Sequence, residues 1–299
     1  MVSDWATDTV YISDLLPKRH PEIVAALRAT LSGRLQTIPG TKDIWVRDFM
    51  PIQLPGNRFV VFRYAPDYLK DYPHVRTDDG ASLLDLDCVR SELVIDGGNV
   101  VRFHDTAIMT GKIYRENPNF ERPRLRDELR RLLEVERLIV IPKEPYDKIG
   151  HADGMVRFVN DKTVLVNDYG MFDAAFGERL AVVLGKHGFD LIPFPHAPTY
   201  DAMYGISSAE GVYINFLQID GAIFFPTFNG SKDDQAMNIL GRCFPTHTII
   251  PIPSADLAVH GGVLNCATWN VKNAKDEERM AAKKRKERKG NAGDCRGRN

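Results

Sequence analysis

The 299-residue sequence predicts an α/β fold, namely a five-bladed αβ propeller built from ββαβ-like repeats. Three observations support this prediction. A hairpin pattern recurs along the chain, its turns recur at an interval of about 50 residues, and segments with helical spacing of apolar residues separate the hairpins. Periodicity alone leaves one alternative open, an unrelated α+β domain that contains several hairpins.

Each predicted hairpin joins two runs of β-branched or aromatic residues through a polar turn. The four hairpins cover residues 50–64, 99–110, 155–167 and 212–228. Their turn residues Asn57, Asp105, Asp161 and Asp220 lie 48, 56 and 59 residues apart. A fifth unit is expected to pair the strand at residues 10–12 with the C-terminal segment, because five units of this length fill the first 270 or so residues.

Apolar residues at helical spacing predict helices between the hairpins, over residues 21–35, 120–133, 174–187 and 233–242. The last two are expected to end at or just beyond Gly188 and Gly241. After Asn270 apolar residues become rare. The sequence therefore predicts a folded domain over residues 1–271 and a basic, disordered tail over residues 272–299.

The net charge of −1 hides an asymmetry between these two parts. The tail holds 11 basic and 5 acidic residues, which leaves 28 basic and 35 acidic residues in 1–271. A mildly acidic body suits cationic substrates. The basic run at 283–289 could contact nucleic acid or an acidic partner. The favoured interpretation is a solvated tail without a function.

Cysteine usage and hydropathy narrow the location of the protein. The four cysteines, Cys88, Cys243, Cys266 and Cys295, are far apart and show neither a disulfide framework nor metal-ligand spacing. No apolar run approaches the roughly 20 residues of a membrane span, and the N-terminus lacks the pattern of a signal peptide. The sequence predicts a cytoplasmic protein without a membrane partner.

Two short segments place carboxylates where they could act on a substrate. In Trp45-Val-Arg-Asp48, an aromatic ring and a carboxylate lie close together, which suits a planar cation. In Asp96-Gly-Gly-Asn99, the double glycine allows close approach to the backbone, and Asp96 could orient an imidazole. Taken singly, the first segment is weak evidence against a structural pair of Arg47 and Asp48, and an ordinary turn is the better explanation of the second.

Two further segments carry an acid/base group and a nucleophile. Gly150-His-Ala-Asp-Gly154 is expected at the start of a strand, where His151 and Asp153 would share one face. Cys266 follows His260-Gly-Gly and precedes small residues, a setting that favours access. A nucleophilic cysteine needs a thiolate, whereas a buried core cysteine is the more common fate of a free thiol.

Taken together and in this order, the four segments resemble the agmatine deiminase and bacterial-type peptidylarginine deiminase family of the guanidino-modifying pentein superfamily. The resemblance covers roughly residues 10–270, and residues 215–228 also resemble a family strand. It implies a pentein catalytic domain over 1–271, which agrees with the repeat count. The family's Trp-Glu-Pro-His-like segment has no match here, from which a more open site is expected.

The resemblance also implies a role for each matching residue. Cys266 matches the nucleophile, His151 the general acid/base, and Asp48 and Asp153 the carboxylates that hold the guanidinium. Asp96 matches an acidic residue expected near His151. Trp45 and Arg47 match the substrate-side motif, and Gly98 and Asn99 the glycine-rich turn. Leu264-Asn265 stands before the cysteine where the family often has His.

These roles imply hydrolysis of a guanidinium group through a covalent thiouronium on Cys266, without a metal or an organic cofactor. The expected partner is a small cationic guanidino compound, with agmatine first and peptidyl arginine and free arginine next. An amidinotransferase and a non-catalytic pentein that binds a guanidino ligand or a protein remain alternatives. A papain-like protease is disfavoured, because it needs no such pair of aspartates and its Cys precedes its His. The sequence does not indicate whether the chain forms a homo-oligomer.

Overall fold

Five three-stranded sheets and one two-stranded sheet form the structure, a computed structural model that describes residues 1–199, 202–203 and 205–273. The predicted tail therefore lies outside the described residues from residue 274 onward. The strands are β1 (Thr9–Ser13), β2 (Leu35–Ile38), β3 (Ile52–Leu54), β4 (Arg58–Arg63), β5 (Cys88–Val94), β6 (Val101–Phe103), β7 (Thr106–Thr110), β8 (Arg137–Ile141), β9 (Val156–Phe158), β10 (Thr163–Asn167), β11 (Asp190–Phe194), β12 (Ala202–Met203), β13 (Ile206–Ser207), β14 (Leu217–Ile219), β15 (Ala222–Thr227), β16 (Thr248–Pro253) and β17 (Thr268–Val271).

All five larger sheets share one pairing pattern. The middle strand pairs antiparallel with one neighbour and parallel with the other: β4 between β3 and β5, β7 between β6 and β8, β10 between β9 and β11, β15 between β14 and β16, and β1 between β17 and β2. The four predicted hairpins are confirmed. The expected fifth pairing is confirmed as well, since β1 runs antiparallel to β17 with Thr9 opposite Val271.

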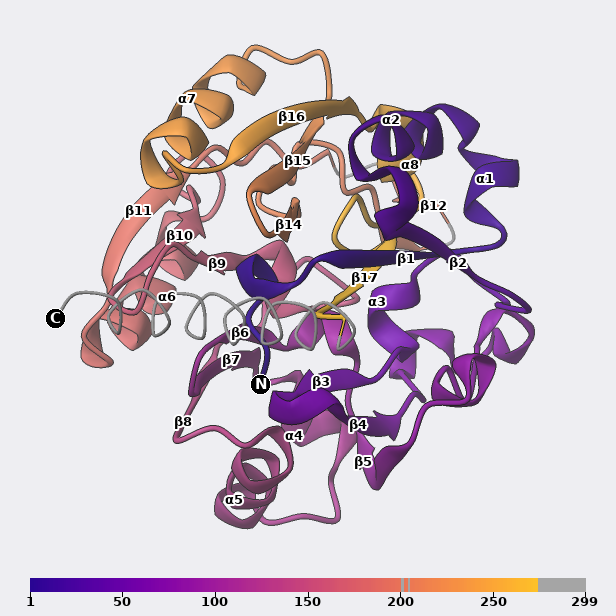
Figure 1. Ribbon diagram of the computed structural model, residues 1–299. Helices are drawn as coiled ribbons and strands as arrows, with labels where there is room; N and C mark the ends of the chain where they lie inside the picture. Colours follow the sequence, from indigo (N-terminus) through magenta and orange to yellow (C-terminus); the bar gives the residue numbers. More distant parts are fainter. Residues whose placement is uncertain (200–201, 204, 274–299) are drawn as a thin grey trace, which may run out of the picture.

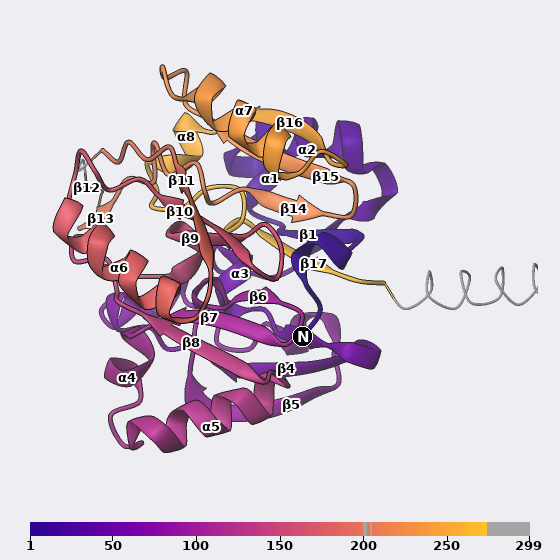
Figure 2. The same cartoon turned by 90° about the vertical axis from the view of Figure 1, so that its left-hand side faces the viewer.

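The helices of the described residues are α1 (Leu16–Arg19), α2 (Pro21–Leu31), α3 (Val46–Phe49), α4 (Lys112–Glu116), α5 (Arg122–Leu133), α6 (Ala174–Lys186), α7 (Asp233–Cys243) and α8 (Ala255–Ala258). Most of them lie in the connection from a middle strand to its parallel neighbour, whereas α3 precedes β3 and α8 precedes β17. In Figures 1 and 2, α5, α6 and α7 lie on the outside of the sheets. This position follows from their amphipathic pattern, in which the leucines of α5 are buried and its arginines face solvent.

The four predicted helices are confirmed with two corrected boundaries. The first ends at Leu31 and not at residue 35, because Ser32 adopts a positive φ of 48° and Leu35 already belongs to β2. The second begins at Arg122 and not at residue 120, with Pro123 in its first turn. One connection differs from the others: between β4 and β5 the chain forms only short 3-10 helices, at residues 67–69, 73–75 and 81–84.

The mixed α/β fold is thus confirmed. The candidate site lies at three short helical turns, each of which precedes the first strand of a sheet. These are α3 before β3, the 3-10 turn Gly97–Asn99 before β6, and the 3-10 turn Ala152–Gly154 before β9. Helix α3 contacts both the Gly97–Asn99 turn and β17, and the Gly97–Asn99 turn also contacts the Ala152–Gly154 turn. Among the described residues, no helix is long and apolar enough to cross a membrane.

Candidate active site

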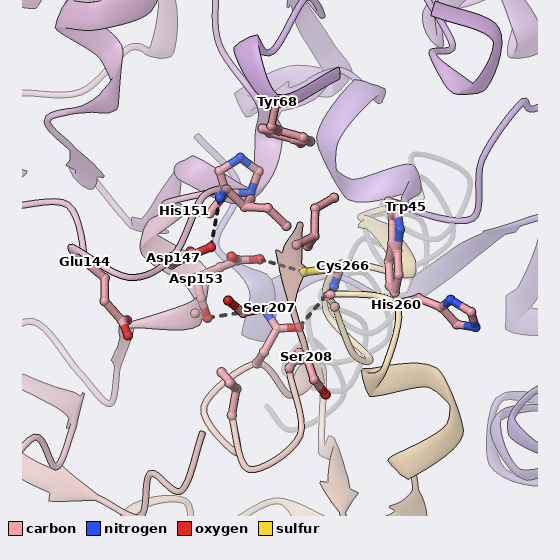
Figure 3. A pocket seen from close by; sticks show the side chains of 18 of the residues that line it. Trp45, Tyr68, Glu144, Asp147, His151, Asp153, Ser207, Ser208, His260 and Cys266 are labelled. Carbon is pink, nitrogen blue, oxygen red and sulfur yellow. Dashed lines mark hydrogen bonds between the residues drawn. The ribbon is translucent and has the colours of Figure 1, made fainter. Parts of the chain in front are cut away.

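A single pocket brings together segments that are more than 200 residues apart in the sequence. Its lining includes Trp45, Asp48, His151, Asp153 and Cys266, as Figure 3 shows for the labelled side chains. Two backbone contacts hold the segments together. The Arg47 N–H donates to the Cys266 carbonyl at 3.1 Å, and the Gly98 N–H donates to Asp48 Oδ1 at 3.0 Å.

His151 and Asp153 reach this pocket through a 3-10 turn and not through the predicted strand. Residues Ala152–Gly154 form that turn, and β9 starts only at Val156. The Asp147 carboxylate accepts hydrogen bonds from the Ile149 and Gly150 N–H groups at 2.8 and 2.6 Å, and Gly150 has a φ of +72°. The turn itself is closed by the Met155 N–H, which donates to the Ala152 carbonyl at 3.0 Å, so residues 152–154 are not extended and the strand prediction was wrong.

The His151 imidazole lies between two buried carboxylates. Its Nε2 is 2.8 Å from Asp96 Oδ2, and its Nδ1 is 3.5 Å from Asp48 Oδ1. Burial lowers the pKa of His151, but the charge of Asp48 and the hydrogen bond with Asp96 outweigh it and raise this pKa to about 9. At neutral pH the ring is therefore an imidazolium, which can donate a proton.

The two candidate substrate-binding carboxylates differ in their surroundings. Burial raises the pKa of Asp48 to about 7, with the nearby His151 opposing the shift. Asp153 Oδ2 accepts a hydrogen bond from Asn265 Nδ2 at 2.7 Å and lies 3.7 Å from the Cys266 sulfur. A cation that enters between the two carboxylates would find one acceptor from each side of the pocket.

The Cys266 thiol is half-buried and lies beside negative charge. Burial raises the pKa of Cys266 well above its usual value, and the charges of Asp153 and Asp48 raise it further. Its backbone N–H donates to Asn215 Oδ1 at 3.3 Å, which fixes the loop that carries it. The thiolate therefore needs a cationic ligand in the pocket, because a positive charge placed near the sulfur lowers the pKa of the thiol.

Four of the nine predicted site residues do not line the pocket. Arg47 is buried and donates to Asn265 Oδ1 and Asn270 Oδ1, at 3.1 and 2.5 Å, so its predicted place on the substrate side does not match the structure. Asn99 Oδ1 accepts the N–H groups of Thr110 and Ala152. Asp96 and Gly98 lie behind His151 and Asp48, which they contact.

Sequence reasoning missed four residues around the site: Tyr68, Lys112, Asn215 and Asn265. Asn215 and Asn265 hold Cys266 and Asp153. Tyr68 and Lys112 contact His151. The position of Asn265 next to Cys266 could have pointed to it. Lys112 could have been found because a charged residue rarely follows a fully buried strand so closely, and here only Gly111 separates it from β7. Nothing in the local sequence pointed to Tyr68.

The outer part of the pocket is also acidic. Asp43, Glu144 and Asp147 line it, and none of the described lining residues is Lys or Arg. Burial raises the pKa of Glu144 to about 7. Glu144 Oε1 lies 4.0 Å from His196 Nε2, and both ring nitrogens of the buried His196 lack a hydrogen-bond partner. An ammonium group could donate to both side chains across this distance.

No group of three or more His, Cys, Asp or Glu side chains in the described ranges is arranged to hold a metal ion.

Gly98 provides a test of how tightly the site is packed. A Cβ at this position would lie 2.6 Å from Asp48 Oδ1 and 2.7 Å from His151 Nδ1. We expect Gly98→Ala to lower the free energy of unfolding by about 1–3 kcal/mol, since overpacking displaces buried groups. Chemical denaturation would measure this change. The matched control is Gly154→Ala, whose Cβ would meet nothing within 4 Å, and an equal loss in both variants would contradict the prediction.

Comparisons with known proteins show the family and the fold of this chain. A family model described as Porphyromonas-type peptidyl-arginine deiminase matches residues 15–271. Agmatine deiminase of Ectopseudomonas mendocina is 28% identical, with 76% of this chain and 74% of the relative aligned. Agmatine deiminase of Pseudomonas aeruginosa is also 28% identical. The alignment covers 59% of this chain and 56% of the relative, so this chain spans just over half of that relative's length.

Solved structures with a related fold include two agmatine deiminases. The enzyme of C. jejuni superposes with a TM-score of 0.70 at 17% identity, over 91% of this chain and 95% of its own. The enzyme of Enterococcus faecalis gives a TM-score of 0.72 at 15% identity, over 90% and 94% of the two chains. At these identities the likeness shows the fold alone.

Proposed function

We propose that this chain, which belongs to the Porphyromonas-type peptidyl-arginine deiminase family, is a hydrolase that converts agmatine to its ureido product and ammonia. One observation supports this proposal above all. A thiol, an imidazolium and two carboxylates converge in one pocket whose described lining holds no Lys or Arg. The names of the curated relatives, agmatine deiminases, agree with it.

The reaction begins when the guanidinium binds between Asp48 and Asp153. The two carboxylates fix its plane and bring its central carbon to the Cys266 sulfur. The bound cation lowers the pKa of the thiol, and the thiolate attacks the carbon to give a tetrahedral adduct. His151 then donates its proton to the departing amino group, the C–N bond breaks, and ammonia leaves.

The second half of the reaction hydrolyses the covalent thiouronium. Water attacks its carbon while the now neutral His151 accepts the proton. The C–S bond breaks, the ureido oxygen gives its remaining proton to solvent, and the neutral product leaves with the thiolate and the imidazolium restored. Asp96 would keep the ring oriented through both steps, since it bonds the nitrogen that faces away from Asp48.

The acidic outer pocket favours agmatine over arginine. Both carry the guanidinium, but agmatine ends in an ammonium group and arginine also carries a carboxylate. Glu144, Asp147 and His196 can receive the ammonium, whereas no Lys or Arg among the described lining residues offers an ion pair to the carboxylate. Free arginine would leave that carboxylate unpaired near other negative charges, which is costly.

We therefore expect kcat/KM for agmatine to exceed that for free arginine and for a blocked arginine peptide by about 100-fold or more. Ammonia release and ureido-product formation would measure it. Butylguanidine is the control compound, because it lacks only the distal amine, and we expect it to react about tenfold less well. Faster turnover of the peptide would favour a peptidyl-arginine deiminase.

Two other outcomes would favour the alternative functions. A transferred amidino group on an added primary amine would indicate an amidinotransferase. Tight agmatine binding without any product, in a folded protein, would indicate a binding module.

The proposal also includes the closure of the five sheets into a propeller, a pentein catalytic domain over residues 1–271, and a cytoplasmic location. The count of five similar sheets supports the propeller.

A further inference from the structure

A fully buried lysine lies against the acid/base imidazole. Lys112 is the first residue of α4, and its side chain has no exposed surface. Its Nζ lies 3.3 Å from His151 Nε2, contacts Asp96 Oδ2, lies 3.4 Å from Glu116 Oε1, and sits 4.6 Å above the ring of Tyr68. Lysine is rarely buried to this degree unless its charge is paired, so this position calls for a physical reason.

The surrounding structure prevents Lys112 from swinging out to solvent. Gly111, just before it, donates its N–H to the Ile141 carbonyl. The Thr110 hydroxyl donates to the Gly150 carbonyl at 2.7 Å, which ties the start of α4 to the loop that carries His151. The Asn117 side chain, at the end of α4, bonds both the N–H and the carbonyl of Val94. Lys112 is therefore held in place from both ends of its helix.

The charge of Lys112 opposes the two carboxylates that face His151. Asp48 and Asp96 favour the imidazolium, while burial and the ammonium group of Lys112 disfavour it and so limit the rise in the pKa of His151. Burial would raise the pKa of Asp96, but Lys112 and His151 lower it to about 2, so Asp96 stays ionised. A ring that must both give and take a proton acts best when its two forms are close in free energy.

We propose that Lys112 is a positioning residue for the second half of the reaction: it holds Asp96 and counters its charge, which lowers the free energy of the neutral His151 that must accept the proton of water after ammonia departs. This inference rests on the proposed function. The charged or titratable groups around His151 and Lys112 come from several elements: Asp48 from α3, Tyr64 and Tyr68 from the β4–β5 connection, Asp96, Glu116 from α4, Lys143 from the segment after β8, and Asp153 and Cys266 from the pocket.

The movement of protons shows in which half of the reaction the charge of Lys112 matters. In the first half, the C–N bond breaks and the imidazolium proton leaves with ammonia. In the second half, water adds to the thiouronium carbon and passes one proton to His151, the C–S bond breaks, and the second proton of the water leaves the ureido oxygen for solvent, where ammonia can take it up. Lys112 keeps its three protons throughout. Without its charge, the two carboxylates would draw a solvent proton back onto His151 before water reacts.

The test uses Lys112→Met, which keeps the length of the side chain and removes its charge. Rapid-quench measurement of ammonia on agmatine should show a burst of about one equivalent per chain at close to the wild-type rate, followed by a steady state at least tenfold slower than wild type. Mass spectrometry of the quenched protein should show the covalent adduct on Cys266 accumulating. The slow phase should continue to accelerate at alkaline pH values where the wild-type rate has levelled.

Arg115→Gln is the matched control. Arg115 lies on the same helix but is exposed and pairs with Asp67 at 2.7 Å, so its loss should leave the burst and the pH profile at wild-type values. Glu116→Gln keeps Lys112 and removes a carboxylate that offsets its charge. The pH at which the second half reaches its plateau should therefore fall, the opposite direction to Lys112→Met. This variant also tests the inference if Lys112→Met does not fold.

The outcomes separate this inference from the proposed function. Wild-type protein that releases no ammonia from any guanidino substrate would overturn the proposed function. Active wild-type protein together with a Lys112→Met variant that shows no burst, or that slows both halves equally, would overturn the role of Lys112. A Glu116→Gln profile that is unchanged or shifted to higher pH would overturn it as well.

Discussion

Replacing Cys266 by alanine is expected to abolish turnover of agmatine, with a loss in kcat of about 10⁴-fold or more. Each half of the reaction passes through a bond to this sulfur, and no other cysteine lines the pocket within the described residues. The measurement is ureido-product formation at saturating agmatine. Circular dichroism and thermal unfolding would show that the variant is folded.

The matched control for this variant is Cys243→Ala. Cys243 is a half-buried free thiol at the end of α7, away from the pocket, and its loss should change kcat by less than about twofold. The same comparison should appear in labelling with an agmatine-like haloacetamidine, which should modify Cys266 in the wild type and nothing in Cys266→Ala. More than about 1% residual turnover in folded Cys266→Ala would contradict the covalent mechanism.

Replacing Asp48 by asparagine is expected to lower kcat/KM for agmatine by about 10³-fold. The variant keeps the shape of the side chain but removes one of the two charges that hold the guanidinium. It also removes a group that raises the pKa of His151, so that pKa should fall. The pH above which the imidazole loses its proton should shift downward, and this shift would appear in the pH profile of the burst of ammonia.

Asp43→Asn provides the control, because it neutralises a carboxyl of the same pocket that does not contact His151. Burial raises the pKa of Asp43 to about 6, and its loss should lower kcat/KM by less than about tenfold. Folded Asp48→Asn protein that keeps more than about a tenth of the wild-type kcat/KM would contradict the role proposed for this carboxylate. An unshifted pH profile would contradict its link to His151.

The sequence predicted most of the fold because each repeat is encoded locally. Alternating apolar residues on either side of a polar turn define a hairpin, and leucines at helical spacing define a helix such as α5. The boundaries were less certain, since Ser32 breaks α2 through a positive φ that its residue type does not announce. The connection from β4 to β5 has no helical pattern and forms no α-helix, yet it supplies Tyr68.

The sequence also predicted which residues would meet at the site, through four motifs and their order. It placed Trp45, Asp48, His151, Asp153 and Cys266 in one pocket and Asp96 next to His151, as the structure has them. It misplaced Arg47, which the family resemblance assigned to the substrate-side motif together with Trp45. In a short helix such as α3, adjacent side chains point in different directions, and Arg47 points into the core toward Asn265 and Asn270.

The sequence alone therefore predicted the chemical types that meet at the candidate site, because its motifs carry a thiol, an imidazole and carboxylates in a set order. Only the tertiary structure decided their protonation and their partners. The pKa of His151 depends on Asp48, Asp96 and Lys112, which come from three separate segments and exert their effects through distances of a few ångströms. Such distances arise when the sheets pack together, and no local pattern in the sequence records them.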